Sequence, residues 1–397
     1  MSAPIGGTAA CADCLRRSWL LAALAPNLDL VWKQRKPLRD VLSLDDGALV
    51  DALGGKDRLE LLARSEAFDA QAALRACERA GVEPVCVHDP RFPPRLRTGP
   101  GAPRLLHVAG GLRRLATLAG ASVSADADAD AGAGAGADPG AGADPAPAVA
   151  VVGTRRASPE GLEMARSLGR GLARAGVTVV SGMALGIDSA AHVGALEGGG
   201  ATVAVLAGAA EIAYPRSKVD LHRRIVAAGC VVSELPPGFE PFRWCFPARN
   251  RIIAGLAQLT LVVEGAERSG SLITADFASA LGREVAAVPG RATSPRTRGS
   301  NGLIRDGATM VLGVEDVLDA VLGFQRVPEA AGAMPATAGL APGLAVLLDA
   351  VAGGSDTVAA LARTPAEADA ALLGLAELEG HGFVRRAPGG RFVVISG

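Results

Sequence analysis

"VVSGMALGIDSAAH", residues 179–192, runs from a strand pattern through a glycine loop into the start of a helix. Two β-branched residues precede Ser181-Gly182, a second glycine follows at Gly186, and a helix is expected from Asp188. Backbone N–H groups point out of such a loop, and the helix N-terminus adds a partial positive charge. The stretch therefore predicts a strand–loop–helix unit that can hold an anion.

The same unit repeats on both sides of this stretch. Short apolar runs, each ended by glycine or a polar turn, alternate with helical segments expected from Pro159, near 217–228, over 250–258 and from Ser271. Nearly continuous apolar strands separated by helices indicate a parallel sheet with helices on both faces, hence an α/β fold. The expected strands are AVAVVG (148–153), GVTVVSG (176–182), ATVAVLAG (201–208), GCVVSEL (229–235), LTLVVEG (259–265) and EVAAVPG (284–290).

Three other segments flank or interrupt this region. Residues 1–80 have helical spacing of apolar positions and predict a helical module. Residues 124–147 contain five aspartates and no apolar face, so we expect a disordered low-complexity linker. Residues 340–397 suggest three helices and a hairpin around Gly389-Gly390, which is the winged-helix order. The predicted domains are thus 1–80, 81–325 and 340–397.

Composition limits the classes of partner. The chain has 397 residues and is 49% hydrophobic, yet no run of about 18 apolar residues predicts a membrane span. The N-terminal residues lack a basic-then-apolar signal pattern, so a cytoplasmic protein without membrane contact is expected. The net charge is −1, so a polyanionic partner must meet a local basic patch.

Six cysteines are scattered through the chain, and Cys11 and Cys14 form its lone C-x-x-C. Cys86 and His88 could complete a zinc site with them. No second pair stands at zinc-finger or zinc-ribbon spacing, however, so free thiols in a reducing cytosol are the preferred interpretation. We predict no metal and no cofactor.

Three loops share the design of the opening stretch: residues 153–155 before the helix cap Ser158, residues 181–182, and residues 269–271. Each offers small residues, hydroxyls and backbone N–H groups. In a parallel sheet the loops after the strands lie along one edge. Three such loops on one edge favour an extended ligand with several phosphates.

Basic and aromatic residues accompany these loops. From Tyr214 to Arg251 there are seven Lys or Arg against three acids, and from Arg283 to Arg305 there are five against one. Cations that follow a phosphate backbone and rings that stack on bases are typical of single-strand binding. The aromatic residues in the first stretch are Tyr214, Phe239, Phe242, Trp244 and Phe246.

Common catalytic motifs are missing: the chain has no G-x-x-x-x-G-K-[ST], H-E-x-x-H or G-x-S-x-G. Asp188 and His192 stand four residues apart and could form an acid–base pair, and Glu264 ends a strand beside the third loop. A structural role is expected for all three, with Glu264 accepting backbone N–H bonds. The loops are therefore expected to hold an anion without reacting with it, and we predict no enzymatic activity.

Several multi-residue motifs resemble the DNA-processing protein A family, also called Smf. The resemblance covers about residues 81–312. It implies an extended Rossmann-like domain that forms a homodimer, binds single-stranded DNA and loads the recombinase RecA onto it during natural transformation. The motifs are HDPRFPPRLR (88–97), VVGTR (151–155), SGMALGIDSAAH (181–192), YPRSKVDL (214–221), RNRIIAGL (249–256), SGSLITA (269–275), VPG (288–290) and GSNGLIRDGA (299–308).

The resemblance also implies which residues bind the DNA. Arg155 matches a phosphate-contacting arginine of the family, and Tyr214 or a nearby ring would stack on a base. Lys218 stands where the family usually has the asparagine of Y-P-x-x-N, so an amide contact is replaced by a point charge. The full implied set is Arg155, Ser181, Gly182, Tyr214, Lys218, Asn250, Arg251, Ser269, Gly270, Ser271 and Asn301.

One enzymatic alternative stays open at this point. Nucleotide hydrolases of the lysine-decarboxylase-like group also have a Rossmann-like sheet and a glycine-rich anion loop, and they resemble P-G-G-x-G-T-x-x-E at the catalytic turn. Here the corresponding turn is S-G-S-L-I-T-A, which lacks that glutamate. Since function depends on the site and not on the fold, the binding protein is preferred.

Overall fold

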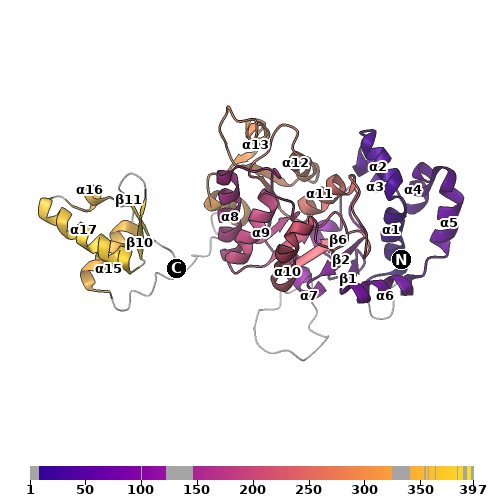
Figure 1. The fold of residues 1–397 in the computed structure, drawn as a ribbon, viewed down its shortest axis with the longest axis horizontal. Helices are drawn as coiled ribbons and strands as arrows, with labels where there is room; N and C mark the ends of the chain where they lie inside the picture. Colours follow the sequence, from indigo (N-terminus) through magenta and orange to yellow (C-terminus); the bar gives the residue numbers. More distant parts are fainter. Residues whose placement is uncertain are drawn as a thin grey trace, which may run out of the picture. The chain divides into compact units, whose positions relative to one another are not determined.

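The structure, a computed structural model, describes residues 9–99, 101–121, 146–323, 340–352, 355, 357–362, 364–381, 383–387 and 391–394. It comprises two compact units, 1–325 and 326–397 (Figure 1). Except for its last two residues, the predicted linker 124–147 lies outside the described residues. No helix within those ranges is both long and apolar enough to cross a lipid bilayer.

A nine-stranded sheet forms the centre of the first unit, in the order β1-β2-β6-β5-β4-β3-β7-β8-β9. The predicted parallel sheet is confirmed from β6 to β9. Two strands that were not predicted, β1 and β2, extend the β6 edge in antiparallel fashion. The strands are β1 Glu83–Cys86, β2 Leu105–Ala109, β3 Ala148–Val152, β4 Thr178–Ser181, β5 Thr202–Val205, β6 Cys230–Ser233, β7 Leu259–Val262, β8 Glu284–Ala287 and β9 Thr309–Met310.

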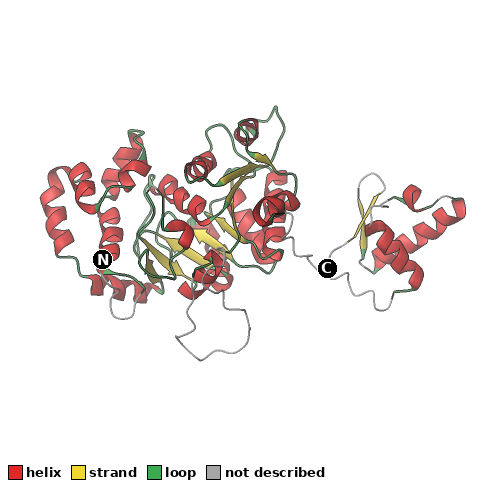
Figure 2. Cartoon of the chain, turned by 180° about the vertical axis from the view of Figure 1, so that it is seen from behind, coloured by secondary structure: helices red, strands yellow, loops and turns green. Residues whose placement is uncertain are grey.

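Helices cover both faces of this sheet (Figure 2). On β3, Val149 and Val151 pack into the core with Leu168 of α8, whereas Ala150 faces the opposite core with Ile252 of α11. Alternate residues of one strand are thus buried on opposite faces, which explains the nearly continuous apolar runs. The helices are α7 Leu112–Ala119, α8 Pro159–Arg174, α9 Ile187–Glu197, α10 Val219–Ala228, α11 Cys245–Leu256, α12 Gly270–Ala280, α13 Arg298–Arg305 and α14 Val314–Leu322.

One helix boundary differs from expectation in a way that matters below. The helix expected from Asn250 begins earlier, at Cys245. Pro247 does not interrupt it, because it lies in the first turn, where proline is tolerated. Both Arg249 and Arg251 are therefore helical and point in different directions from the helix axis. Elsewhere α9 begins at Ile187 and α12 at Gly270, each one residue before the expected start.

The N-terminal region is helical, as predicted. Its helices are α1 Ala12–Ala23, α2 Ala25–Lys33, α3 Leu38–Leu42, α4 Asp46–Leu53, α5 Arg58–Glu66 and α6 Ala70–Ala80. They enclose a core that includes Leu20, Leu28 and Leu49 and that continues into Leu235 and the buried ring of Trp244. The N-terminal helices therefore pack against α11 and the loop after β6.

The second unit contains α15 Pro342–Ala352, α16 Val358–Leu361 and α17 Pro365–Gly380, followed by the hairpin strands β10 Val384–Ala387 and β11 Arg391–Val394. Leu348, Leu375, Leu378 and Phe392 form its own core. Three helices followed by an antiparallel hairpin give the winged-helix order. The hairpin turn, residues 388–390, lies outside the described residues.

Candidate functional site

The strand order places a crevice beside β3. Chain order runs from β3 to β4 on one side, whereas β7 pairs with β3 on the other. The loops that follow β3 and β7 therefore lead away from each other, and ligands bind at such a switch point in open α/β sheets. A cavity of about 690 Å³ lies here. Its lining includes Gly153, Thr154, Arg155, Arg156, Asp188, Tyr214, Arg243, Phe246, Arg249, Asn250, Arg268, Ser269, Gly270 and Ser271.

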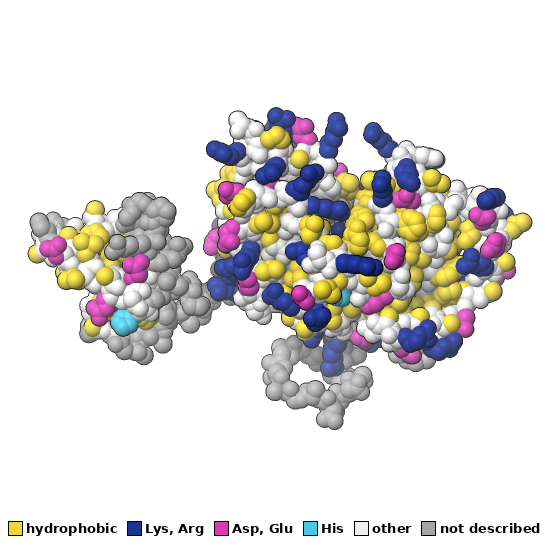
Figure 3. Space-filling model, in the orientation of Figure 1, with side chains coloured by type: hydrophobic (Ala, Val, Ile, Leu, Met, Phe, Trp, Pro, Cys, Tyr) yellow, Lys and Arg dark blue, Asp and Glu magenta, His cyan; other side chains and the backbone are white. Residues whose placement is uncertain are grey.

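The cavity is strongly cationic. Four of its arginines, Arg155, Arg156, Arg243 and Arg268, are exposed, and none forms an ion pair within the described part of the chain. Asp188 is the carboxylate among the described lining residues. Figure 3 shows Lys and Arg side chains gathered over the part of the first unit that carries α11, α12 and α13. Unpaired guanidinium groups around a concave surface attract a polyanion.

Two rings and a cation form a small platform at the cavity. The Tyr214 and Phe246 ring centroids lie 5.4 Å apart. The Arg155 guanidinium lies 5.1 Å from the Phe246 centroid, within cation–π range. Tyr214 is 43% exposed, so one face of its ring remains available to solvent. This arrangement can stack on a planar ligand while Arg155 meets a neighbouring negative charge.

The turn at the start of α12 is fixed by its own polar groups. Ser269 caps the helix, and its Oγ lies 2.8 Å from Ser271 Oγ. Asn250 reaches across from α11 and donates through Nδ2 to the Gly270 carbonyl at 3.1 Å. A Cβ added at Gly270 would meet nothing within 4 Å, so the backbone is open on that side. The N-terminus of α12 thus adds a partial positive charge to the cavity, which favours an anion.

Glu264 holds the loop after β3 to the end of β7. Its carboxylate accepts from the Ser158 N–H at 3.0 Å and from Ser158 Oγ at 2.7 Å, and its backbone carbonyl accepts from the Thr154 N–H at 2.7 Å. The side chain is buried. The expectation that Glu264 binds backbone N–H groups is therefore confirmed, and its carboxylate is committed to positioning the loop.

The loop after β4 corrects one part of the sequence interpretation. Ser181 is fully buried and its Oγ donates to the Val151 carbonyl at 2.6 Å, so its hydroxyl does not face the cavity. Gly182 lines a smaller neighbouring cavity of about 160 Å³. Its carbonyl accepts from Arg249 Nη1 at 2.7 Å, and a Cβ at this position would overlap the guanidinium. Met183 follows with a φ of +53°, a strained conformation for a non-glycine residue.

Arg249 is one of the site residues that the predicted set missed, together with Arg156, Arg243 and Arg268. Its Nη1 also donates to the Val205 carbonyl, so the side chain joins the loops after β4 and β5 beneath the cavity. Burial is the main reason that its pKa falls to about 10, and the neighbouring charge of Arg155 lowers it further. The guanidinium is still protonated at neutral pH. The signal was present in Arg249-Asn250-Arg251, but a motif does not say which arginine faces the sheet edge.

Three more predicted residues lie away from the cavity. Arg251 is buried, and its Nη2 contacts both oxygens of Glu234 at 2.8 and 2.7 Å, which corrects its assignment as a phosphate ligand. Asn301 bonds Gly290 through both amide atoms, at 2.9 and 3.0 Å, and so fixes the loop after β8. Lys218, at the end of a short 3-10 helix, is not among the described lining residues. Of the predicted set, the structure brings together Arg155, Tyr214, Asn250, Ser269, Gly270 and Ser271.

Asp188 and His192 are packed inside the protein. His192 is fully buried with Nδ1 2.9 Å from Thr202 Oγ1, and burial lowers its pKa to about 3. The imidazole is therefore neutral at physiological pH and lies out of reach of a bound ligand. Burial raises the pKa of Asp188, although its carboxylate accepts from the Ala184 N–H at 3.4 Å. This geometry favours a structural role for both residues.

The part of the chain that carries this cavity is similar in sequence to known proteins. The profile of the family DNA recombination-mediator protein A matches residues 141–322. A putative DNA processing protein DprA from Mycobacterium tuberculosis is 48% identical over 172 residues, which are 43% of this chain and 44% of that protein. The DNA processing protein DprA of Bacillus subtilis is 40% identical over 179 residues, 45% of this chain and 58% of that protein. The chain thus spans about half the length of these relatives.

The similarity extends further in three dimensions. The X-ray structure of DNA processing protein A from Streptococcus pneumoniae matches with a TM-score of 0.58 and 30% sequence identity. The match covers 78% of this chain and 96% of the Streptococcus chain. The chain therefore belongs to the DNA-processing protein A (DprA/Smf) family.

Proposed function

We propose that this chain binds single-stranded DNA in the cavity beside β3 and holds it without chemical change. The observation that carries the proposal is the cavity's four exposed, unpaired arginines together with the Tyr214–Phe246 pair. Exposed arginines would neutralise successive phosphates, and the rings would stack on an unpaired base. A duplex keeps its bases stacked inside, so the ring platform favours a single strand.

The cavity's polar groups support binding rather than hydrolysis. Glu264 is committed to Ser158, and His192 is neutral and buried, so neither is placed to move a proton at a bound phosphate. A general acid or base must lie within hydrogen-bond reach of the reacting group. The S-G-S-L-I-T-A turn supplies a helix cap at Ser269 in place of the glutamate expected of the nucleotide hydrolases. We therefore propose a binding protein that is not an enzyme.

Family membership supports three finer parts of the proposal. The chain would act in the cytoplasm as a homodimer and load RecA onto the bound strand during natural transformation and recombination. Two cavities on one strand would raise avidity without any new contact. Sedimentation analysis should show a dimer, and RecA filaments should form faster on protein-coated single strands when the chain is added.

Fluorescence anisotropy with a labelled oligonucleotide tests DNA binding directly. Affinity should fall steeply with salt, with a logarithmic slope of about −0.7 for each phosphate contact. Arg155→Ala should weaken binding about tenfold, equivalent to ~1.4 kcal/mol, and reduce the slope by one contact. Tighter binding of mononucleotides than of oligonucleotides, with release of a hydrolysed product, would support the hydrolase instead.

Arg174→Ala is the matched control. Arg174 is exposed and lies in the last turn of α8, whose N-terminal cap Ser158 is tied to the cavity loops. Fifteen residues along a helix separate it from that end by about 22 Å. The same charge is lost far from the cavity, so affinity should stay within about twofold of wild type. Equal losses in both variants would mean that the cavity is not the binding site.

A further inference from the structure

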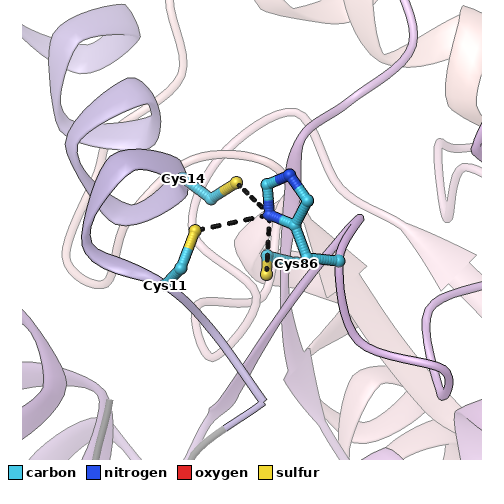
Figure 4. A group of neighbouring side chains, drawn as sticks. Cys11, Cys14 and Cys86 are labelled. Atoms are coloured by element: carbon cyan, nitrogen blue, oxygen red, sulfur yellow. Dashed lines mark hydrogen bonds between the residues drawn. The ribbon is translucent and has the colours of Figure 1, made fainter. Parts of the chain in front are cut away.

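We propose that Cys11, Cys14, Cys86 and His88 bind one zinc ion that fastens α1 to β1. The four potential ligand atoms all lie within 4.8 Å of one another. Figure 4 shows the three thiols converging on the imidazole, two from the start of α1 and one from the end of β1. Sequence spacing favoured free thiols, because 71 residues separate Cys14 from Cys86; the fold brings these distant ligands together.

The backbone holds the ligands on two connected elements. Cys11 is the N-cap of α1, and Cys14 lies in the first turn of that helix. Cys86 is the last residue of β1, and His88 follows in the next turn. The Cys86 N–H donates to the Ala9 carbonyl at 2.8 Å, so the segment before α1 is already bonded to the end of β1. The ligand positions are therefore set by secondary structure.

The distances match a tetrahedral zinc centre. His88 Nδ1 lies 3.4 Å from Cys11 Sγ and 3.7 Å from the sulfurs of Cys14 and Cys86. Zinc bonds of about 2.3 Å to sulfur and about 2.0–2.1 Å to nitrogen, at the tetrahedral angle, give a sulfur–nitrogen separation of about 3.6 Å. All three distances lie close to this edge of the tetrahedron.

Hydrogen bonding alone does not account for the cluster. One ring nitrogen offers either one N–H or one lone pair, so it can bond to one thiol and not to three. The three cysteines are free rather than joined in disulfides, and all are buried. A cation at the centre of the cluster would give every one of these groups a partner.

The donor set favours zinc in a structural role. Three thiolates and one imidazole form one of the usual structural zinc sets, and four protein ligands leave no open position for a substrate. The bound site would carry one net negative charge, which the N-terminal end of α1 would offset.

Metal analysis of the full chain tests the proposal. Protein purified in reducing buffer without chelator should contain about one zinc per chain. Cys86→Ser and His88→Ala should each lower the content to about a tenth or less, because structural zinc needs all four ligands. Cys245→Ser removes a buried thiol of α11 outside the cluster and should leave the content unchanged.

A second measurement keeps the test informative if a ligand variant fails to fold. Wild-type chain that has been stripped of metal and given Co²⁺ should develop the intense visible absorption of a tetrahedral cobalt–thiolate centre, and zinc should displace it. A wild-type chain with less than about a tenth of an equivalent of zinc and no cobalt spectrum would overturn the proposal. So would iron as the bound metal, or a Cys11–Cys14 disulfide in the native protein.

Discussion

The cavity beside β3 and helix α17 of the second unit occupy the positions at which two kinds of DNA-binding fold contact nucleic acid. One is the switch point of an open sheet, and the other is the recognition helix of a winged helix. The cavity has four exposed, unpaired arginines. Helix α17 contains no Lys or Arg, and Glu367, Asp369 and Glu377 are exposed on it.

Since function depends on the side chains of a site and not on its position in the fold, this difference predicts different ligands for the two regions. On α17 the exposed leucines Leu372 and Leu373, 43% and 73% exposed, lie among the acids. Leu375 and Leu378 of the same helix are buried in the unit's own core. A surface of leucines and carboxylates suits a protein partner with a basic, apolar surface better than it suits a phosphate backbone.

Charge reversal at the cavity should have the largest effect. Arg155→Glu combined with Arg268→Glu replaces two attractive contacts with two repulsive ones. We expect single-strand affinity to fall about a thousandfold, ~4 kcal/mol, at physiological salt. Anisotropy titrations would measure it, with Arg174→Glu as the control that reverses one charge far from the cavity. A fall in single-strand affinity of less than tenfold would mean that the arginines of the cavity do not distinguish it from α17 as a DNA-binding surface.

Arg251→Ala should damage stability and not binding. Removing the guanidinium leaves the Glu234 carboxylate with a buried, unpaired charge, since both of its oxygens contact Arg251. Breaking such a pair typically costs about 3 kcal/mol or more. Urea unfolding followed by tryptophan fluorescence should show this loss, while single-strand affinity measured below the transition stays near that of wild type.

The double variant Arg251→Met with Glu234→Leu separates the two roles. It removes both charges together, and replacement of a buried pair by apolar groups is often neutral. Stability should therefore recover most of the loss caused by Arg251→Ala. A stable Arg251→Ala variant that binds single strands tenfold more weakly would restore Arg251 as a phosphate ligand.

Arg249 and Arg251 show which features of the site can be predicted from the sequence and which cannot. The alternation of apolar runs and helices predicted β3 to β8 because strand burial on both faces leaves a direct pattern in the sequence. The antiparallel strands β1 and β2 were missed because they lie before the predicted linker, outside the repeating series of strands and helices. Residue identity also predicted that Arg155 and the Ser269–Ser271 turn would lie at the sheet edge, since both belong to loops between a strand and the next helix.

Side-chain direction was not predictable in the same way. Arg249 and Arg251 differ by two positions on α11, so one faces the sheet edge and the other faces Glu234. The direction of each side chain depends on where α11 begins. Because Pro247 lies in the first turn, the sequence did not predict that the helix starts as early as Cys245. The four residues of the cysteine cluster were named from the sequence as a possible zinc site, but their spacing along the chain could not show that they lie together, as they do in the fold.

Acid should destabilise the first unit more than the second. Burial lowers the pKa values of His107 and His192 to about 3, against 6.5 for an unburied histidine. Between those values the unfolded chain binds more protons, so the free energy of unfolding decreases as pH falls below 6.5. The loss should approach ~1.4 kcal/mol per pH unit for each histidine and level off near pH 3.

Tryptophan fluorescence reports this transition selectively, because Trp19, Trp32 and Trp244 all belong to the first unit. The second unit has one histidine, His381, which is exposed at the C-cap of α17. His192→Asn keeps a neutral donor near Thr202 and should make the acid dependence shallower by about one proton. An unchanged slope in this variant would mean that His192 protonates freely in the folded protein.

The smallest effect is expected from the second unit. A chain ending at residue 325 should bind single strands within about twofold of the full chain, since the four exposed arginines of the cavity lie in the first unit. Residues 340–397 alone should bind duplex DNA no more tightly than about 10⁻⁴ M at physiological salt, the strength of non-specific contact. Arg385, Arg386 and Arg391 of the hairpin can supply such contact.

Reversing the charge of α17 sharpens this last prediction. Asp369→Lys with Glu377→Lys replaces two exposed acids and spares Glu367, whose carboxylate accepts from the Thr364 N–H at the helix cap. If repulsion is what keeps the winged helix from duplex DNA, the variant should bind more tightly, with a salt slope steeper by about 0.9 per new phosphate contact. Gel shifts with random and genomic duplexes would measure both proteins. Tight, sequence-selective retention of the wild-type segment would show that α17 enters the major groove despite its acids, and the assignment of this surface to a protein partner would fail.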